Sequence, residues 1–267
     1  MSVFFIFAGK TTHNNMKRLL LLLAAALAAF SAQAQLYEHN HTTDTQLHTG
    51  FQMSGRIGDR WGLNWGEELY FGNNISEFQK VYSRLMVNYY LRPNLTLSPM
   101  VMHIASASGA RTMIYDMNVI YTHRVDRWAI TLRGGTRLQD KLYPTVGGSG
   151  QVWAAPEFQL RGHLGVAYKT NTRLEPFANI ESFLLLNPAS DTVLDHTRYT
   201  VGYYLPRVRS NVGVKVRIDP HSSLSLYWRY DHTQTKHLSY LIAGAPYAVY
   251  TNSNTTNFVG VFYNYAF

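Results

Sequence analysis

The chain contains no cysteine, and only 15% of its 267 residues are charged. Without cysteine it cannot carry a disulfide framework or a thiolate metal site. Beyond residue 34 it also lacks any run of about 20 apolar residues, the length that a membrane-spanning helix needs. If that part of the chain crosses a membrane, it therefore crosses it with β-strands.

A strong positive charge is missing as well, although the formal net charge of the whole chain is +8. Three basic residues and no acidic ones lie in the N-terminal region that we expect to be removed: Lys10, Lys17 and Arg18. Their loss from 24 basic residues leaves 21 against 16 acidic residues, a net charge of +5. The remaining basic residues are spread along the chain, and no nucleic-acid-binding motif is present. We therefore expect no nucleic-acid partner.

An N-terminal segment over residues 16–34 has the features of a secretory signal peptide. Lys17 and Arg18 precede an apolar run from Leu19 to Phe30, and small residues follow it. This pattern predicts cleavage between Ala34 and Gln35. The apolar run is too short for a membrane anchor, and no cysteine follows the cut as a lipoprotein would require.

These features predict the domain organisation. Residues 1–15 lie ahead of a complete signal peptide and indicate an upstream mis-start, with Met16 as the true start. Residues 35–45 form a polar leader, and residues 46–267 form a single β-domain.

The domain alternates between apolar and polar residues with a period of two, which is typical of strands that have a different solvent on each face. In the clearest example, Trp128, Ile130 and Leu132 alternate with Thr131 and Arg133. Eleven segments show the pattern: 46–57, 61–71, 81–91, 95–104, 111–125, 128–138, 158–169, 174–184, 199–218, 224–228 and 256–267.

Short turns near residues 58, 93, 126, 171 and 219 alternate with longer loops near 75, 107, 147, 191 and 245. Together with 14% aromatic residues, this pattern predicts an all-β fold, an antiparallel transmembrane β-barrel. Because single-chain bacterial barrels have an even number of strands, we expect about twelve strands, with ten as the alternative. The twelfth would come from a break at Pro206, from residues 238–250 or from the mature N-terminus.

The last strand indicates where such a barrel is found. Val259, Val261, Tyr263, Tyr265 and Phe267 occupy alternate positions up to the C-terminus. This segment resembles the closing strand of bacterial outer-membrane barrels, which their assembly machinery recognises. The resemblance implies export through the periplasm to the outer membrane. The expected partners are that machinery, outer-membrane lipid and lipopolysaccharide, and Phe267, Tyr265 and Tyr263 form the expected assembly signal.

Several short motifs in a fixed order resemble the domain-of-unknown-function 2490 family of outer-membrane proteins. They are the segment Trp61 to Phe71 with its Glu-Glu-Leu, Tyr82-Ser-Arg84-Leu, Leu132-Arg-Gly-Gly-Thr-Arg137, Glu175-Pro-Phe-Ala-Asn-Ile-Glu181-Ser-Phe183 and Arg198-Tyr-Thr-Val-Gly202. The likeness extends over nearly all of the mature chain. It implies the fold and the location, and it implies no reaction.

Charged residues on the polar face are the candidate functional residues. Those that we expect to face the lumen are Arg84, Asp116, Arg133, Arg137, Arg161, Glu175 and Glu181, with Arg209 and Arg217 on the same face of other strands. In one interpretation they fill a narrow lumen as ion pairs, since an unpaired buried charge is costly. In the other they line a basic pore for small solutes that favours anions.

No residue spacing predicts a catalytic, cofactor or metal site. His39 and His41 have no third ligand nearby, and the glycines at 147–150 lack the lysine of a phosphate loop. An outer-membrane lipid- or surface-processing hydrolase with an active site at the barrel rim is the alternative function. It would need a Ser-His pair ordered by an acid; His103, His163 and Ser182 lie in strands, but no spacing singles them out, and Ser182→Ala or His163→Ala would test for such an activity.

Overall fold

The computed structural model describes residues 41–144, 151–153, 156–187, 192–194, 197–199, 204–239 and 248–267. All of them belong to one compact unit, His39–Phe267. Within these ranges every regular element is a β-strand, and no helix there has the length and apolar character to cross a membrane. The expected upstream segment, signal peptide and cleavage site at Ala34 and Gln35 lie outside the described residues.

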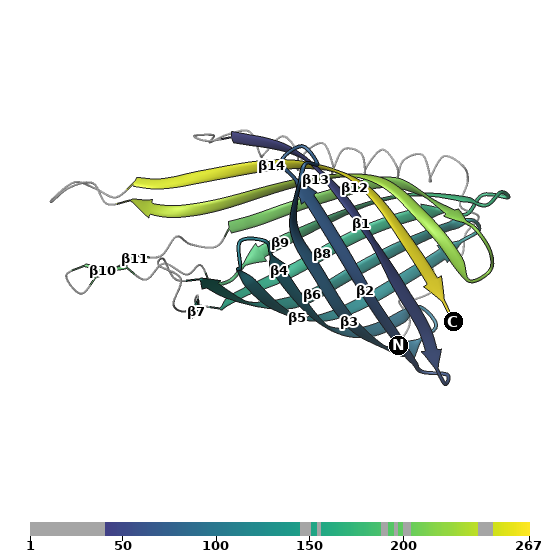
Figure 1. Cartoon of the computed structure of the whole chain (residues 1–267). Helices are drawn as coiled ribbons and strands as arrows, with labels where there is room; N and C mark the ends of the chain where they lie inside the picture. The colour runs from purple at the N-terminus through teal and green to yellow at the C-terminus, as the bar shows by residue number, and fades with distance from the viewer. Residues whose placement is uncertain are drawn as a thin grey trace, which may run out of the picture. The chain divides into compact units, whose positions relative to one another are not determined.

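Eleven strands form the wall of a closed barrel (Figure 1). They are β1 (His41–Ile57), β2 (Trp61–Gly72), β3 (Glu77–Arg92), β4 (Leu95–Ser106), β5 (Arg111–Val125), β6 (Trp128–Pro144), β8 (Glu157–Tyr168), β9 (Leu174–Leu185), β12 (Tyr204–Arg217), β13 (Ser222–Ser239) and β14 (Ala248–Ala266). Three short strands are not part of this ring: β7 (Gln151–Trp153) pairs antiparallel with the last residues of β6, and β10 (Thr192–Leu194) pairs with β11 (Thr197–Tyr199). The prediction of an all-β barrel is confirmed.

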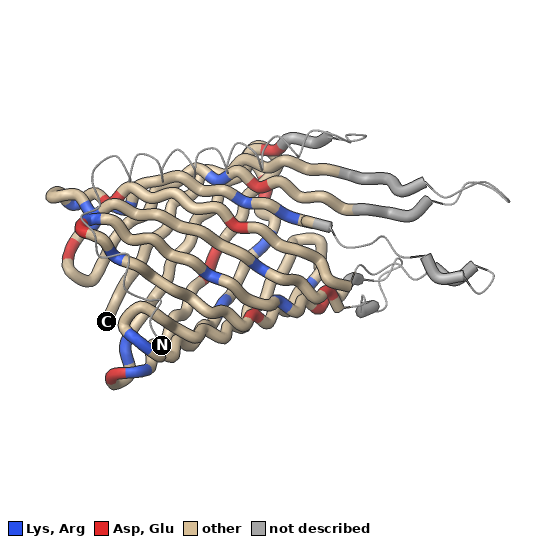
Figure 2. The backbone as a smooth tube through the Cα atoms, turned by 180° about the vertical axis from the view of Figure 1, so that it is seen from behind, with Lys and Arg blue, Asp and Glu red and all other residues tan. Residues whose placement is uncertain are grey.

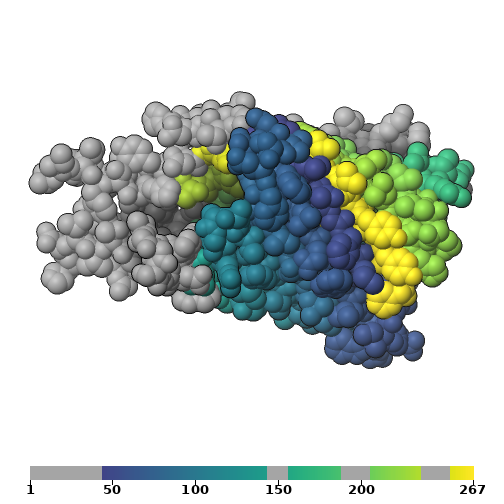
Figure 3. All heavy atoms as spheres, viewed as in Figure 1, coloured from purple at the N-terminus to yellow at the C-terminus, as the bar shows by residue number. Residues whose placement is uncertain are grey.

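The ring closes through a parallel pair of strands, β1 and β14. Their register runs from His41 opposite Ser253 to Ser54 opposite Ala266. All other neighbours in the wall are antiparallel, so successive strands reverse direction. With an odd number of strands, the first and the last then point the same way, and closure joins them in parallel. Figure 3 shows this seam, where purple β1 lies beside yellow β14.

The count of eleven equals the number of alternating segments in the sequence and is one fewer than the twelve strands expected from even-numbered barrels. Pro206 does not split β12; it falls in a register irregularity between Tyr204 and Arg207. β1 begins at His41, so the end of the expected polar leader belongs to the first strand. No additional wall strand occurs in the described ranges, because the parallel seam already pairs both edges.

The two faces of the wall differ as the alternation predicts. In β2, exposed Trp61, Trp65 and Leu69 alternate with buried Asn64 and Glu68. The same alternation, with apolar side chains outside and polar side chains inside, holds around the ring, so the outer surface is an apolar belt. Its exposed members include Leu85, Val101, Met117, Val119, Leu132, Leu160, Val212, Leu226 and Val259. Aromatic rings gather where the short turns join the strands, with Trp61 on Tyr89 and Trp128 on Tyr168.

The short turns define one end of the barrel, here called the turn end, and the longer connections define the loop end. Asp126 has a φ of 52° in the two-residue turn between β5 and β6, a conformation that Asp adopts more readily than most residues. In the turn between β12 and β13, the hydroxyl of Ser222 and the backbone N–H of His221 donate hydrogen bonds to the Asp219 carboxylate and lower its pKa. β1 and β14 both run from the loop end to the turn end.

Candidate functional site

The inner face of the barrel carries charged residues on most of the wall strands. Figure 2 marks the Lys, Arg, Asp and Glu positions along the tube. Those on the inner face meet in two clusters, one on the β5–β13 side of the ring and the other on the β1–β3 side. Together we call them the lumen network.

Asp116 of β5 is the first centre of the network. The guanidinium of Arg137 donates two hydrogen bonds to it, each 2.8 Å long, in the bidentate arrangement that fits a carboxylate. Arg161 of β8 reaches over β6 and donates a third, 2.5 Å long. Both guanidinium groups also pack on the ring of Phe183, at 4.9 and 5.5 Å from its centre. Asp116 is only 4% exposed, so these contacts replace its hydration.

Glu181 of β9 is the second centre. Arg133 and Arg161 each donate to its carboxylate at 2.6 Å, and Arg209 of β12 lies 3.5 Å away. Arg209 also contacts Asp231 of β13 at 3.2 Å, and Arg207 makes an ion pair with the same carboxylate. Shared arginines therefore join the carboxylates into a continuous chain from β5 to β13.

The second cluster is built around Glu68 of β2. The His48 Nε2 lies 3.0 Å from its carboxylate, Arg84 lies 3.1 Å away, and the Tyr70 hydroxyl donates to it at 3.1 Å. The rings of His48 and Tyr70 stack with their centres 4.3 Å apart. Strands β1, β2 and β3 are thus tied together on the inside of the barrel.

Long side chains from β13, which also carries Asp231 of the first cluster, reach the second cluster. Tyr227 reaches over β14 to hydrogen-bond His48, and its ring lies where a Cβ of Gly260 would otherwise project. Arg229 donates to the Tyr70 hydroxyl at 3.2 Å and to the Asn211 side chain at 2.6 Å. Of the described wall strands, all except β4 and β14 thus contribute a charged or hydrogen-bonding side chain to the lumen network, which follows the inner face of the wall.

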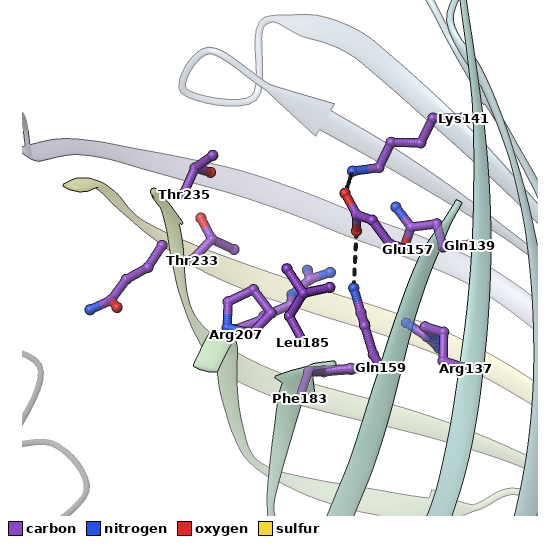
Figure 4. Close-up of a pocket in the computed structure, with 12 residues that line it drawn as sticks. Arg137, Gln139, Lys141, Glu157, Gln159, Phe183, Leu185, Arg207, Thr233 and Thr235 are labelled. Atoms are coloured by element: carbon purple, nitrogen blue, oxygen red, sulfur yellow. Dashed lines mark hydrogen bonds and ion pairs between the residues drawn. The ribbon is translucent and has the colours of Figure 1, made fainter. Parts of the chain in front are cut away.

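A cavity of about 220 Å³ lies on the loop-end side of the network. Figure 4 shows Arg137 and Arg207 among its lining residues, with Lys141 paired to Glu157, which accepts a 3.1 Å hydrogen bond from Gln159. No group of three or more residues with metal-ligand side chains occurs in the described part of the chain.

The structure brings most of the candidate residues together. Asp116, Arg133, Arg137, Arg161 and Glu181 form one connected set, while Arg84 belongs to the second cluster. Glu175 lies apart, opposite Lys215 in the register of β9 and β12. Sequence reasoning missed Glu68, Asp231, His48, Tyr227 and Arg229. For Glu68 the signal was the adjacent pair Glu67-Glu68, since the alternation of a strand requires one of the two carboxylates to face inward.

The structure does not bring Ser182 and His163 together. His163 pairs in register with the buried Glu181, whereas Ser182 pairs with Gly162 on the opposite face of the wall. The two side chains therefore point to different sides of the barrel, and they cannot form a nucleophile and base. At the turn end, the backbone N–H of Phe267 donates to the Ser54 carbonyl, and the residue is 63% exposed.

The family model described as a protein of unknown function, DUF2490, matches residues 45–240. The chain belongs to this family. The likeness seen in the sequence motifs is thereby confirmed, and no activity comes with it. No curated protein matches the chain. Among solved structures, the crystal structure of the beta domain of the Bordetella autotransporter Brka matches with a TM-score of 0.36 and 13% identity, over 78% of this chain and 83% of that one.

Proposed function

We propose that this DUF2490 protein is an outer-membrane β-barrel whose lumen is closed by the lumen network, so that it acts as a membrane scaffold and not as a diffusion pore. The observation that carries the proposal is the reach of Tyr227 and Arg229 across neighbouring strands, together with the shared arginines of the first cluster. These contacts bring long polar side chains from strands that are not adjacent together on the inner face, where they take up space that water would occupy in an open pore.

The apolar belt supports the membrane placement. A continuous outer surface of exposed Leu, Val, Met and aromatic side chains is costly in water and suits hydrocarbon, and rings at the turn end suit the membrane interface. In barrels of this kind short turns lie in the periplasm and longer loops outside. The signal peptide over residues 16–34 supplies the export route.

A narrow passive pore is the second candidate, and the charge balance of the network favours it over a neutral filling. Seven arginines face four carboxylates, an excess of three positive charges: Arg84, Arg133, Arg137, Arg161, Arg207, Arg209 and Arg229 against Glu68, Asp116, Glu181 and Asp231. If the lumen conducts, this excess makes it selective for anions.

Measuring ion current across planar lipid bilayers distinguishes the closed scaffold from the narrow pore. We expect the wild-type protein to give no stable conductance steps, because the network leaves no continuous water path. Replacing Arg84, Tyr227 and Arg229 together by alanine removes the side chains that span the β1–β3 side, and we expect steps to appear. Anion-selective steps from the wild-type protein would reject the closed lumen and establish the pore.

The matched control changes the outward neighbours Leu85, Trp228 and Tyr230 to alanine on the same strands. These variants lose similar side-chain volume from the wall but leave the network intact, so we expect no current. Heat-modifiable gel migration checks that each variant is a folded barrel. Equal currents from the inner and outer variants would mean that damage to the wall, and not opening of the lumen, produces the conductance.

We further propose that Phe267, with Tyr265 and Tyr263, binds the assembly machinery before the seam closes. The exposed ring of Phe267 contributes little burial to the finished barrel. Deleting Phe267 is therefore expected to lower the amount of protein that reaches the outer membrane, while refolded protein stays nearly as stable as wild type. Membrane yield in cells and unfolding in vesicles measure the two effects. Normal yield with lowered stability would show that the ring serves only the folded wall.

A further inference from the structure

A row of three polar side chains interrupts the apolar belt on the outer face of β2, β3 and β4. Glu67 pairs in register with Ser83, and Ser83 pairs with His103. All three occupy the alternate positions whose side chains face the same side of the wall as exposed Trp65 and Leu85, so they are on the outer surface and not in the lumen. Directly paired residues on one face of a sheet have Cβ atoms about 4.5–5.5 Å apart, which brings the three functional groups within reach of one another.

This row, which we call the outer polar row, is surrounded by apolar side chains. The register places one apolar row on each side of it along the strands: Trp65, Leu85 and Val101 toward the turn end, and Leu69, Val81 and Ala105 toward the loop end. Phe51 of β1 lies next to Glu67, and Met113 of β5 lies next to His103. The row is therefore an isolated polar patch within the belt.

Glu67 is held differently from the carboxylates inside the barrel. Glu68, Asp116, Glu181 and Asp231 are bound by arginines, whereas the Glu67 Oε2 accepts a 2.7 Å hydrogen bond from the Ser83 hydroxyl. Placing a carboxylate on an apolar surface costs free energy because the group loses its hydration, and one hydrogen bond from a serine offsets little of that cost. The arrangement is, however, that of a nucleophile in contact with a general base, with an imidazole on the other side of the nucleophile.

We propose that Ser83, Glu67 and His103 form a site on the outer wall that cleaves an acyl ester of a membrane lipid. The Ser83 Oγ adds to the ester carbonyl carbon while its proton passes to Glu67, and an N–H of His103 donates to the developing oxyanion. The bond from the carbonyl carbon to the lipid alcohol breaks, and the alcohol oxygen takes the proton from Glu67. Water then gives a proton to Glu67 and its oxygen to the acyl carbon; the bond to Ser83 breaks, and the serine recovers the proton. The net reaction is ester plus water to carboxylic acid plus alcohol.

The position of the row along the strands fits a substrate of this class. Ser83 and His103 lie nearer to the loop-end limits of their strands, Glu77 and Ser106, than to the turn end, and Glu67 lies near the middle of β2. In the membrane orientation proposed above, on which this inference rests, the row therefore runs from the middle of the belt toward the outer headgroups, with His103 nearest to them. Ester carbonyls lie between hydrocarbon and headgroup, on the side of the row where His103 is. The flanking apolar rows would hold the acyl chains.

The test uses the full-length protein in mixed micelles, with two probes assayed separately: a glycerophospholipid and lipopolysaccharide. We expect fatty acid to be released from at least one of them, and the probe that reacts identifies the lipid. Ser83→Ala should lower the rate at least ~100-fold, and Glu67→Gln should lower kcat by a similar factor with little change in KM. A fluorophosphonate should label Ser83 in the wild-type protein and fail to label Ser83→Ala.

Ser182→Ala is the matched control. Ser182 also faces outward, but its partners in register are Gly162 and Val208, which offer no base. We expect this variant to keep the wild-type rate. No release of fatty acid from either lipid overturns the proposal, and so does release that Ser83→Ala leaves unchanged. Heat-modifiable migration of the same samples tests the barrel independently, so a folded but inactive protein rejects the outer-wall site and leaves the proposed scaffold function intact.

Discussion

Replacing Asp116 by alanine is expected to lower the free energy of unfolding by about 3–5 kcal/mol, the typical cost of removing one partner from a buried ion pair. The variant leaves the guanidinium groups of Arg137 and Arg161 without the carboxylate that accepts three of their hydrogen bonds. Both arginines lie in the interior, so water cannot fully replace the lost contact. Urea unfolding in lipid vesicles measures the change.

Two further variants make this result specific. Asp59→Ala changes an exposed carboxylate in the turn between β1 and β2, and we expect a change within about 0.5 kcal/mol. Adding Arg137→Met and Arg161→Met to Asp116→Ala should recover much of the lost stability, because apolar replacement of a whole buried ion-pair set is often neutral or stabilising. If Asp116→Ala alone lowers the free energy of unfolding by less than Asp59→Ala does, the lumen network does not stabilise the wall.

A disulfide between residues 47 and 259 is expected to form readily, because the parallel seam places Leu47 of β1 directly opposite Val259 of β14. Neighbouring strands lie about 4.8 Å apart, within the range of Cα separations that disulfides accept. The chain has no cysteine of its own, so Leu47→Cys with Val259→Cys is the sole thiol pair. Oxidation should convert most of the folded protein to a faster-migrating species on a non-reducing gel.

The register control pairs Leu47→Cys with Tyr263→Cys. Tyr263 lies opposite Phe51, four residues farther along the seam, about 13 Å from the position opposite Leu47. We expect no cross-link from this pair. A cross-link there, with none at Val259, would show a different register. Failure of both pairs would show that β1 and β14 are not neighbours, as a barrel with a twelfth strand between them would require.

The short turns are a part of the fold that could be predicted from a few neighbouring residues. The sequence predicts short turns near residues 126 and 219, where Asp126-Arg127 and Asp219-Pro220 stand, and the structure has the β5–β6 and β12–β13 hairpins there. These turns depend on contacts within a few residues, such as those that the backbone around His221 makes with Asp219. The expectation of an even number of strands, by contrast, came from a general rule about barrels, and the observed number, eleven, is odd.

The candidate site shows where local information ends. Strand parity separates the arginines and carboxylates of one face from the apolar residues of the other, but it cannot say which charge meets which. Arg161 bonds to Asp116 across an intervening strand, and Tyr227 meets His48 although 179 residues separate them in the chain. The sequence shows Ser182 and His163 in strands but cannot say whether they meet, and the pairing of β8 with β9 places them on opposite faces.

By itself, then, the sequence determined the strands, their two faces, most turns and the family, because the period of two and the turn residues are properties of short segments. Only the tertiary structure decided the parallel closure of β1 on β14, the connections of the lumen network and the alignment of Glu67, Ser83 and His103. The physical reason is register. A shift of one strand by a single residue would leave each segment's own pattern unchanged but would turn every side chain of that strand to the other face.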